Sequence, residues 1–83
     1  SIEMLLRLFD NRVEAIEFTA SAGSPLLNIP LRDLSLKSDL LITCISHGSE
    51  IRIPDGNDCI QEGDSVIIAT KQLGLRELED ILA

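Results

Sequence analysis

Apolar residues at the start of the chain recur at helical spacing. Ile2, Leu5 and Phe9 stand at positions i, i+3 and i+7, which predicts an amphipathic helix over residues 2–9. Further apolar residues widen the stripe beyond one face, so this helix should pack on two sides. Residues 1–12 are therefore expected to be the end of a crossover or linker helix and the turn after it. The side chains expected to contact a partner or a preceding domain are Leu5, Leu6 and Phe9.

Apolar segments after residue 12 predict four short strands. Residues 13–20 alternate between apolar and polar positions, which is typical of a strand with one exposed face. Residues 40–45 and 65–70 are apolar at successive positions and predict central strands. Residues 50–53 predict a short strand after a hairpin turn.

Two helical segments complete the expected fold. Residues 30–34 begin with a proline, which the first helical position tolerates, and predict a short helical turn. Residues 74–82 carry an apolar stripe on one face and charged residues on the other, which predicts a closing helix. The predicted fold class is α+β: a small domain of about four mostly antiparallel strands with a short helical turn and a C-terminal helix, spanning residues 13–83.

Composition narrows the choice of partners. The chain has 83 residues, 45 % of them apolar and 25 % charged, which is typical of one small globular domain. The formal net charge is −7, with only seven Lys and Arg, so no nucleic-acid partner is expected. No apolar run is long enough to span a bilayer, so direct membrane insertion is not expected. Two cysteines, Cys44 and Cys59, are expected to be reduced thiols in a cytoplasmic protein.

The residues that carry catalysis or bind cofactors in other proteins do not form a pattern here. The glycines are too scattered for a dinucleotide fingerprint or a phosphate-binding loop. Residues 55–58 resemble a calcium loop only in composition, because Ile60 stands where that loop requires glycine. Cys44 and His47 lie at odd spacing on a predicted strand, which directs them to opposite faces. We therefore expect neither an enzyme nor a metal site.

Binding remains as the expected role. Arg32 in the short helical turn and His47 at the predicted hairpin lie close in sequence to apolar residues. Arg32 could equally be a solvent-exposed arginine, and His47 could equally be a histidine of the hairpin turn. The residues alone therefore leave both a ligand-binding role and a role without a ligand open.

The order of these signals resembles a known domain family. Ser24-Pro25-Leu26 precedes the helical turn, and the segment Ile53-Pro54-Asp55-Gly56 is followed about seven residues later by Gly63-Asp64 and an apolar strand. Over residues 13–82 this pattern is similar to the C-terminal domain of TrkA-type regulators of potassium conductance, the RCK C-terminal or TrkA-C domain. One departure is Asn28, where many members have glycine after the apolar pair.

The resemblance implies a cytoplasmic regulatory domain that forms a homodimer or a higher ring beneath a membrane potassium transporter or channel subunit. It implies no cofactor within this chain, since NAD(H) or ATP would bind a preceding domain. In some relatives the cyclic dinucleotide c-di-AMP binds across the dimer two-fold. The resemblance implies that Leu26 and Leu27 would contact the bases and that Arg32 would contact a phosphate. The full set of positions that match the ligand site of those relatives is Leu26, Leu27, Arg32, His47 and Pro54.

Other functions stay open on the sequence. The domain could be a structural dimerisation and coupling module without a ligand, or it could regulate an anion or dicarboxylate transporter. A fragment of an enzyme is the third class, and it would require a buried titratable group in a catalytic setting.

Overall fold

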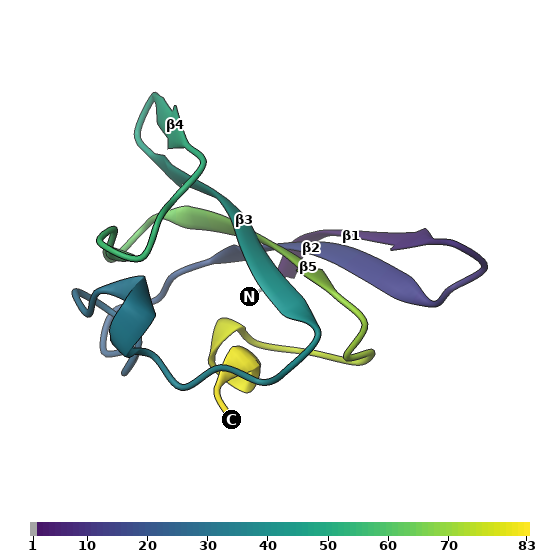
Figure 1. Cartoon of the computed structure of the whole chain (residues 1–83). Coiled ribbons are helices and arrows are strands. Elements are labelled where there is room, and N and C mark those ends of the chain that lie inside the picture. Colours follow the sequence, from purple (N-terminus) through teal and green to yellow (C-terminus); the bar gives the residue numbers. More distant parts are fainter. Residues whose placement is uncertain (1) are drawn as a thin grey trace.

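Five antiparallel strands form one sheet in the computed structural model, which describes residues 2–83. The strand order is β1-β2-β5-β3-β4, so β5 lies at the centre of the sheet (Figure 1). Two short 3-10 helices, η1 and η2, lie in the connecting and C-terminal segments on one side of the sheet (Figure 1). The elements are β1 (Ile2–Leu8), β2 (Val13–Thr19), η1 (Leu31–Asp33), β3 (Leu40–His47), β4 (Glu50–Arg52), β5 (Ser65–Thr70) and η2 (Leu78–Ile81).

The segment predicted as a helix over residues 2–9 is strand β1, so this prediction was wrong. β1 pairs antiparallel with β2 and therefore belongs to the same sheet as the rest of the domain. An isolated helix of eight residues is marginal because its first turn costs conformational entropy. Pairing with β2 satisfies the backbone groups of β1 that face β2 instead. Of the predicted linker segment, residue 1 lies outside the described residues.

A tight turn joins β1 to β2. Residues 9–11 have positive φ angles of 53°, 56° and 65°. The Arg12 amide donates to the Leu8 carbonyl at 3.1 Å and closes the hairpin. Asp10 and Asn11 tolerate the left-handed conformation better than most residues. The turn predicted at residues 10–12 is confirmed, and it brings two strands together where a helix end was expected.

The predicted C-terminal helix is reduced to the single 3-10 turn η2, so this prediction was also wrong. Gly74 has a φ of +82° and Glu77 is extended, which breaks the helical path before η2 begins. Beyond η2, Leu82 forms an isolated bridge with Leu36, which draws the chain back across the molecule. The domain is therefore mostly strand with two 3-10 helices. The apolar stripe predicted for this segment does face the core, since Leu75, Leu78 and Ile81 are buried and Leu82 is partly buried against them.

The core lies between one face of the sheet and the segments that cross it. The strands contribute alternate residues, as the pattern of β2 and β5 predicted. The fully or nearly fully buried apolar side chains are Ile16, Phe18, Ala20, Leu26, Ile42, Ile45, Ile60, Val66, Ile68, Leu75, Leu78 and Ile81.

The opposite face of the sheet is more open. β3 is apolar at successive positions, but only one of its faces is covered, since the Leu41 side chain is 64 % exposed. Ile51 on β4 is 71 % exposed. The central positions of β3 and β5 are confirmed, because each pairs with strands on both sides.

Candidate ligand pocket

The short helix η1 is fixed by the loop that follows β4. The Leu31 amide donates to the Asp58 carbonyl at 2.9 Å, and the Arg32 amide donates to the Gly56 carbonyl at 3.0 Å. A Cβ atom at Gly56 would lie 3.1 Å from the Cβ of Arg32, which is tighter than ordinary packing. Glycine at this position therefore allows the loop to approach η1 closely enough to hold the backbone of Arg32.

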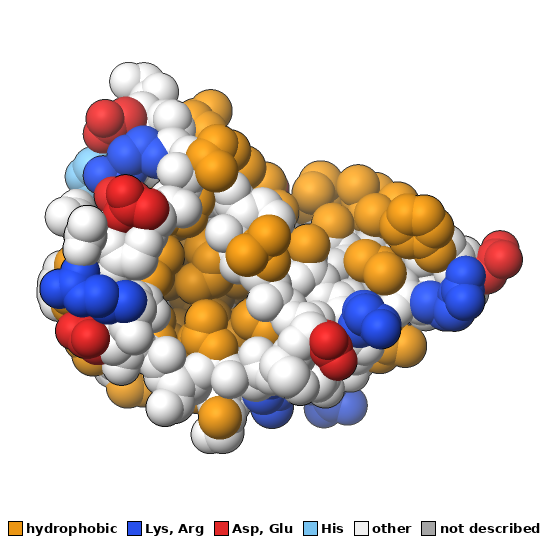
Figure 2. Space-filling view, in the orientation of Figure 1, with side chains coloured by type: hydrophobic (Ala, Val, Ile, Leu, Met, Phe, Trp, Pro, Cys, Tyr) orange, Lys and Arg blue, Asp and Glu red, His pale blue; other side chains and the backbone are white. Residues whose placement is uncertain are grey.

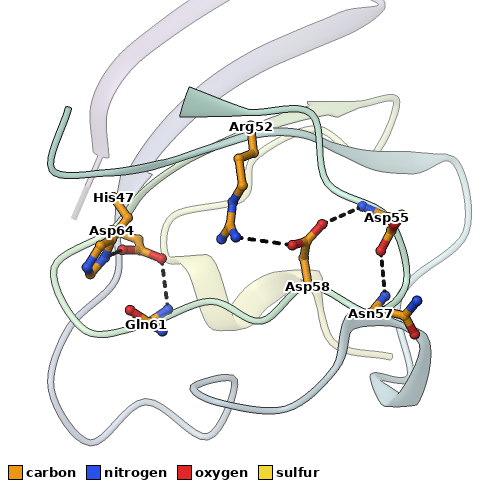
Figure 3. A network of polar contacts seen from close by, with 7 residues as sticks. All are labelled: His47, Arg52, Asp55, Asn57, Asp58, Gln61 and Asp64. Atoms are coloured by element: carbon orange, nitrogen blue, oxygen red, sulfur yellow. Dashed lines mark hydrogen bonds and ion pairs between the residues drawn. The ribbon is translucent and has the colours of Figure 1, made fainter. Parts of the chain in front are cut away.

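A polar network keeps this loop folded (Figure 3). The Asp55 amide donates to Asp58 Oδ2 at 2.8 Å, and the Asn57 amide donates to Asp55 Oδ1 at 2.8 Å. Arg52 on β4 pairs with Asp58 Oδ1 at 3.3 Å. The carboxylates of Asp55 and Asp58 thus accept hydrogen bonds within the turn, and Asp58 also links the turn to β4. Within residues 2–83 no group of three His, Cys, Asp or Glu side chains is arranged to hold a metal ion.

A hollow of about 250 Å³ opens between η1 and the first residues of β3. Figure 2 shows apolar side chains in this hollow and charged side chains on the rim beside η1. The lining residues are Leu31, Arg32, Leu36, Leu40, Leu41, Ile42, Pro54, Asp55 and Gly56. We call this hollow the η1 pocket. An apolar lining with a small number of charged groups is typical of sites that bind small molecules.

The cation of the η1 pocket is only partly neutralised. The Arg32 side chain is 56 % exposed, and its guanidinium lies 3.9 Å from the Asp33 carboxylate. Arg32 also donates to the Asn57 side-chain carbonyl. These contacts orient the guanidinium while leaving donors directed to solvent, and an arginine can bind a phosphate through two parallel hydrogen bonds.

The five predicted ligand residues are not all brought together. Arg32 and Pro54 both line the η1 pocket. Leu26 is completely buried in the core, so its side chain does not reach a surface in this conformation. Leu27 is half-buried, forms an isolated parallel bridge with Ile60 and does not line the η1 pocket.

His47 lies at the end of β3, held by a buried acid (Figure 3). Its Nδ1 is 2.5 Å from Asp64 Oδ1, and the Asp64 side chain is fully buried. The second oxygen of Asp64 accepts a hydrogen bond from the Gln61 amide at 2.9 Å. His47 therefore connects β3 to the turn before β5, and it does not line the η1 pocket.

The predicted contact residues at the front of the chain lie on β1 and its turn. Leu5 packs against the core, whereas Leu6 and Phe9 are 50 % and 70 % exposed. Asn28 has a φ of +61°, a conformation that asparagine tolerates better than most residues, and its amide donates to the Ile60 carbonyl at 2.8 Å. The departure at Asn28 thus leaves the loop fold intact.

Several pocket residues were missed from the sequence. Leu40 and Leu41 were predicted only as strand residues and Leu36 was given no role, and nothing in their spacing relates them to Arg32. The residues around Gly56 were visible as a turn motif, which signals a loop but not the element it packs against. A second hollow of about 320 Å³ opens near the start of β3 and the end of β5, and none of the predicted ligand residues lines it.

Outside the η1 pocket, the Asp80 carboxyl has a lowered pKa. Amide hydrogen bonds from Arg76 and Glu77 lower the pKa of Asp80 below its ordinary value of 3.8, and nearby Lys37 adds to the effect. This carboxyl caps η2 and lies apart from the η1 pocket. Among the described residues, no helix is long and apolar enough to cross a membrane.

Comparison with known proteins adds a family. A family model described as the TrkA-C domain matches residues 15–83. The chain is 32 % identical over 80 residues to the Trk system potassium uptake protein TrkA homolog 2 of Methanosarcina mazei, covering 96 % of this chain and 18 % of that protein. It is 33 % identical over 78 residues to TrkA homolog 1 of the same organism, covering 94 % of this chain and 17 % of that protein. The chain thus spans less than a fifth of the length of these relatives.

Proposed function

The chain belongs to the TrkA-C domain family, and on this premise we propose that it is a cytoplasmic regulatory domain of a potassium-uptake system. The observation that carries the proposal is the match of the family model to residues 15–83. Curated relatives with the same domain are named as potassium uptake proteins of the Trk system. The domain would act as a homodimer, or within a larger ring, that transmits a signal to a membrane transporter subunit.

We further propose that the η1 pocket binds a phosphate-containing small molecule such as c-di-AMP. Arg32 would bind a phosphate, and the apolar floor formed by Leu31, Leu36 and Leu40 would contact a base. A two-fold axis near the pocket would present two Arg32 side chains to a ligand that carries two phosphates. NAD(H) or ATP would bind a different domain, since this chain carries no nucleotide-binding glycine motif.

A ligand can regulate only through different affinities for two arrangements of the dimer. The loop of residues 54–58 is the natural element for this, because it both lines the pocket and hydrogen-bonds to η1. Binding would then stabilise one position of η1 relative to β3.

A coupling module without a ligand is the second candidate. The observation in its favour is that only Arg32 and Pro54 of the five predicted ligand residues line one pocket. In that case the dimer would transmit a signal sensed in another domain of the protein. The membrane subunit, and not this domain, would determine whether potassium or an anion is transported.

A thermal-shift titration of this chain with c-di-AMP, ATP, NADH and potassium, together with its mass in solution, tests the proposal. A ligand at a hundredfold excess over its Kd stabilises the folded state by about 2.7 kcal/mol. We expect a shift with c-di-AMP that is lost in Arg32→Ala and retained in Arg76→Ala, a matched change at an exposed arginine near η2. His47→Ala, measured in parallel, tests the remaining predicted contact.

A dimer that shows no shift with any of these ligands would refute the sensing role and favour the coupling module. A shift that survives Arg32→Ala would refute the η1 pocket as the binding site.

A further inference from the structure

The position of η1 depends strongly on backbone contacts with the loop that follows β4. None of the three residues of η1 is fully buried. The first amides of a helix have no partner within the helix and need one outside it. The Leu31 amide donates to the Asp58 carbonyl at 2.9 Å, and the Arg32 amide donates to the Gly56 carbonyl at 3.0 Å. The place of Arg32 at the rim of the η1 pocket therefore follows the position of this loop.

Asp58 contacts three parts of the molecule at once. Its carbonyl accepts the Leu31 amide of η1, and its Oδ2 accepts the Asp55 amide at 2.8 Å. Its Oδ1 lies 3.3 Å from Arg52 Nη1 on β4 (Figure 3). The Asp58 side chain is 23 % exposed, so water screens these contacts only in part. Because the carboxylate and the carbonyl belong to one residue, a displacement of the side chain also displaces the acceptor that holds η1.

Arg52 reaches this loop from the edge of the sheet. β4 is three residues long and lies at the end of the strand order, beside β3. Figure 1 shows the β3–β4 hairpin extending away from the rest of the sheet. Segments with few buried contacts open at a lower free-energy cost than the core. The Arg52 guanidinium therefore connects the loop to a part of the sheet whose displacement would leave the core intact.

The Arg52 guanidinium also contains a donor that the fold leaves unpaired. Its Nη1 pairs with Asp58, whereas its Nε is buried and has no hydrogen-bond partner among residues 2–83. Buried donors are almost always paired in folded proteins, because an unpaired donor lowers stability. The burial of this arginine is therefore not explained by stability alone. A role in positioning the loop provides an explanation.

We propose that Asp58 and Arg52 are positioning residues for the η1 pocket. Their ion pair sets the spacing between β4 and the loop, and the Asp58 carbonyl then determines where η1 and Arg32 lie. A ligand that stabilises one position of η1 also favours one position of β4, since coupling between two sites is reciprocal. This inference rests on the proposed function of the η1 pocket, and it adds a connection from that pocket to the β4 edge of the sheet.

Hydrogen exchange of this chain without a ligand tests the positioning. Arg52→Met removes the charge and keeps an unbranched side chain. Asp58→Asn weakens the ion pair and keeps a side-chain oxygen as acceptor. In both variants we expect the Leu31 and Arg32 amides to exchange roughly five- to tenfold faster, while the β5 amides keep their wild-type rates.

Matched changes outside the loop serve as controls. Arg76→Met and Glu62→Gln alter exposed side chains of the same charge and should leave the exchange of the η1 and β5 amides unchanged. Arg52→Lys keeps the positive charge and should restore most of the protection of η1. Rescue by charge separates the ion pair from simple packing of the Arg52 side chain.

A second measurement adds c-di-AMP as the probe. When it is bound at the η1 pocket, it should slow exchange of the β4 amides and leave those of β1, at the other edge of the sheet, unchanged. This effect should disappear in Arg52→Met, in which the Kd for c-di-AMP should rise roughly tenfold. A residue that only stabilises the fold would not connect the ligand to β4.

The outcomes separate this inference from the proposed function. Wild-type exchange of the η1 amides in both Arg52→Met and Asp58→Asn would overturn the positioning role. Exchange that rises equally in β5 would also overturn it, because it would reflect a general loss of stability. If the wild type does not bind c-di-AMP but the changes are confined to η1, the proposed ligand fails and the positioning role stands. If c-di-AMP binds and Arg52→Met alters neither its Kd nor the exchange of η1, the proposed function stands and this inference fails.

Discussion

Replacing Asp64 by alanine should destabilise the domain more than any other single acidic substitution in the loop before β5. The Asp64 side chain is fully buried, accepts a hydrogen bond from the Gln61 amide at 2.9 Å, and lies 2.5 Å from His47 Nδ1. Hydrogen bonds to charged groups contribute about 1.5–3 kcal/mol each. The half-exposed His47 side chain reduces its share because water screens that contact.

These contributions give a loss of about 2–3 kcal/mol for Asp64→Ala, combining the hydrogen bond from the Gln61 amide with the solvent-screened contact to His47. For a domain of this size the loss corresponds to a fall in Tm of roughly 10–20 °C. Asp64→Asn keeps an acceptor for the Gln61 amide, so we expect about half the loss.

Urea and thermal unfolding of Asp64→Ala, Asp64→Asn and wild type measure these values, with the exposed neighbour Glu62→Ala as the matched control. A double-mutant cycle with His47→Ala should give a coupling of about 1 kcal/mol, since the two side chains touch. The reasoning is refuted if Asp64→Ala costs no more than Glu62→Ala, or if the His47 and Asp64 substitutions are additive.

Two further predictions concern the pocket loop and the C-terminal turn. Gly56→Ala places a methyl group 3.1 Å from the Cβ of Arg32, so it should lower the free energy of unfolding by about 1 kcal/mol. It should also weaken the thermal shift produced by c-di-AMP. An unchanged thermal shift would show that the loop can move away from η1 without loss of binding. Amide hydrogen bonds hold the pKa of Asp80 below 3.8, so its contribution is complete above that value and is lost as pH falls through the lower, folded-state pKa. The stability difference between wild type and Asp80→Ala, about 1 kcal/mol near neutral pH, should therefore shrink below pH 4 in acid titrations followed by circular dichroism; a difference that persists to the lowest pH would contradict the assignment.

The candidate site shows where sequence reasoning reached its limit. Arg32 and Pro54 are far apart in the chain, and only the resemblance to TrkA-C domains put them in one set. Their proximity depends on backbone hydrogen bonds between η1 and the loop of residues 54–58, which no periodicity reveals. Leu26 was expected at the ligand only because the resemblance to TrkA-C domains matched it to a ligand-contacting position. The Leu26 side chain is buried because it lies on the side of the segment before η1 that packs against the core.

The errors at the two ends of the chain share a cause. Residues 2–8 are apolar at both helical and strand positions, so their pattern is compatible with either structure. The tight turn at residues 9–11 and the free edge of β2 decided in favour of the strand. Residues 74–82 have a helical stripe, but the positive φ of Gly74 and the bridge between Leu36 and Leu82 limit the helix to one turn.

The sequence by itself determined the strands from residue 13 onward, the inward residues of the closing segment, the acidic charge and the family. These follow from local alternation, from turn residues and from motifs that lie within a few positions of one another. The tertiary structure alone decided the sheet order, the fifth strand, the partner of His47 and the separation of His47 and Leu26 from the pocket that Arg32 and Pro54 line. Such features arise from contacts between segments distant in the chain, whose free energy depends on how the whole sheet packs and not on any one segment.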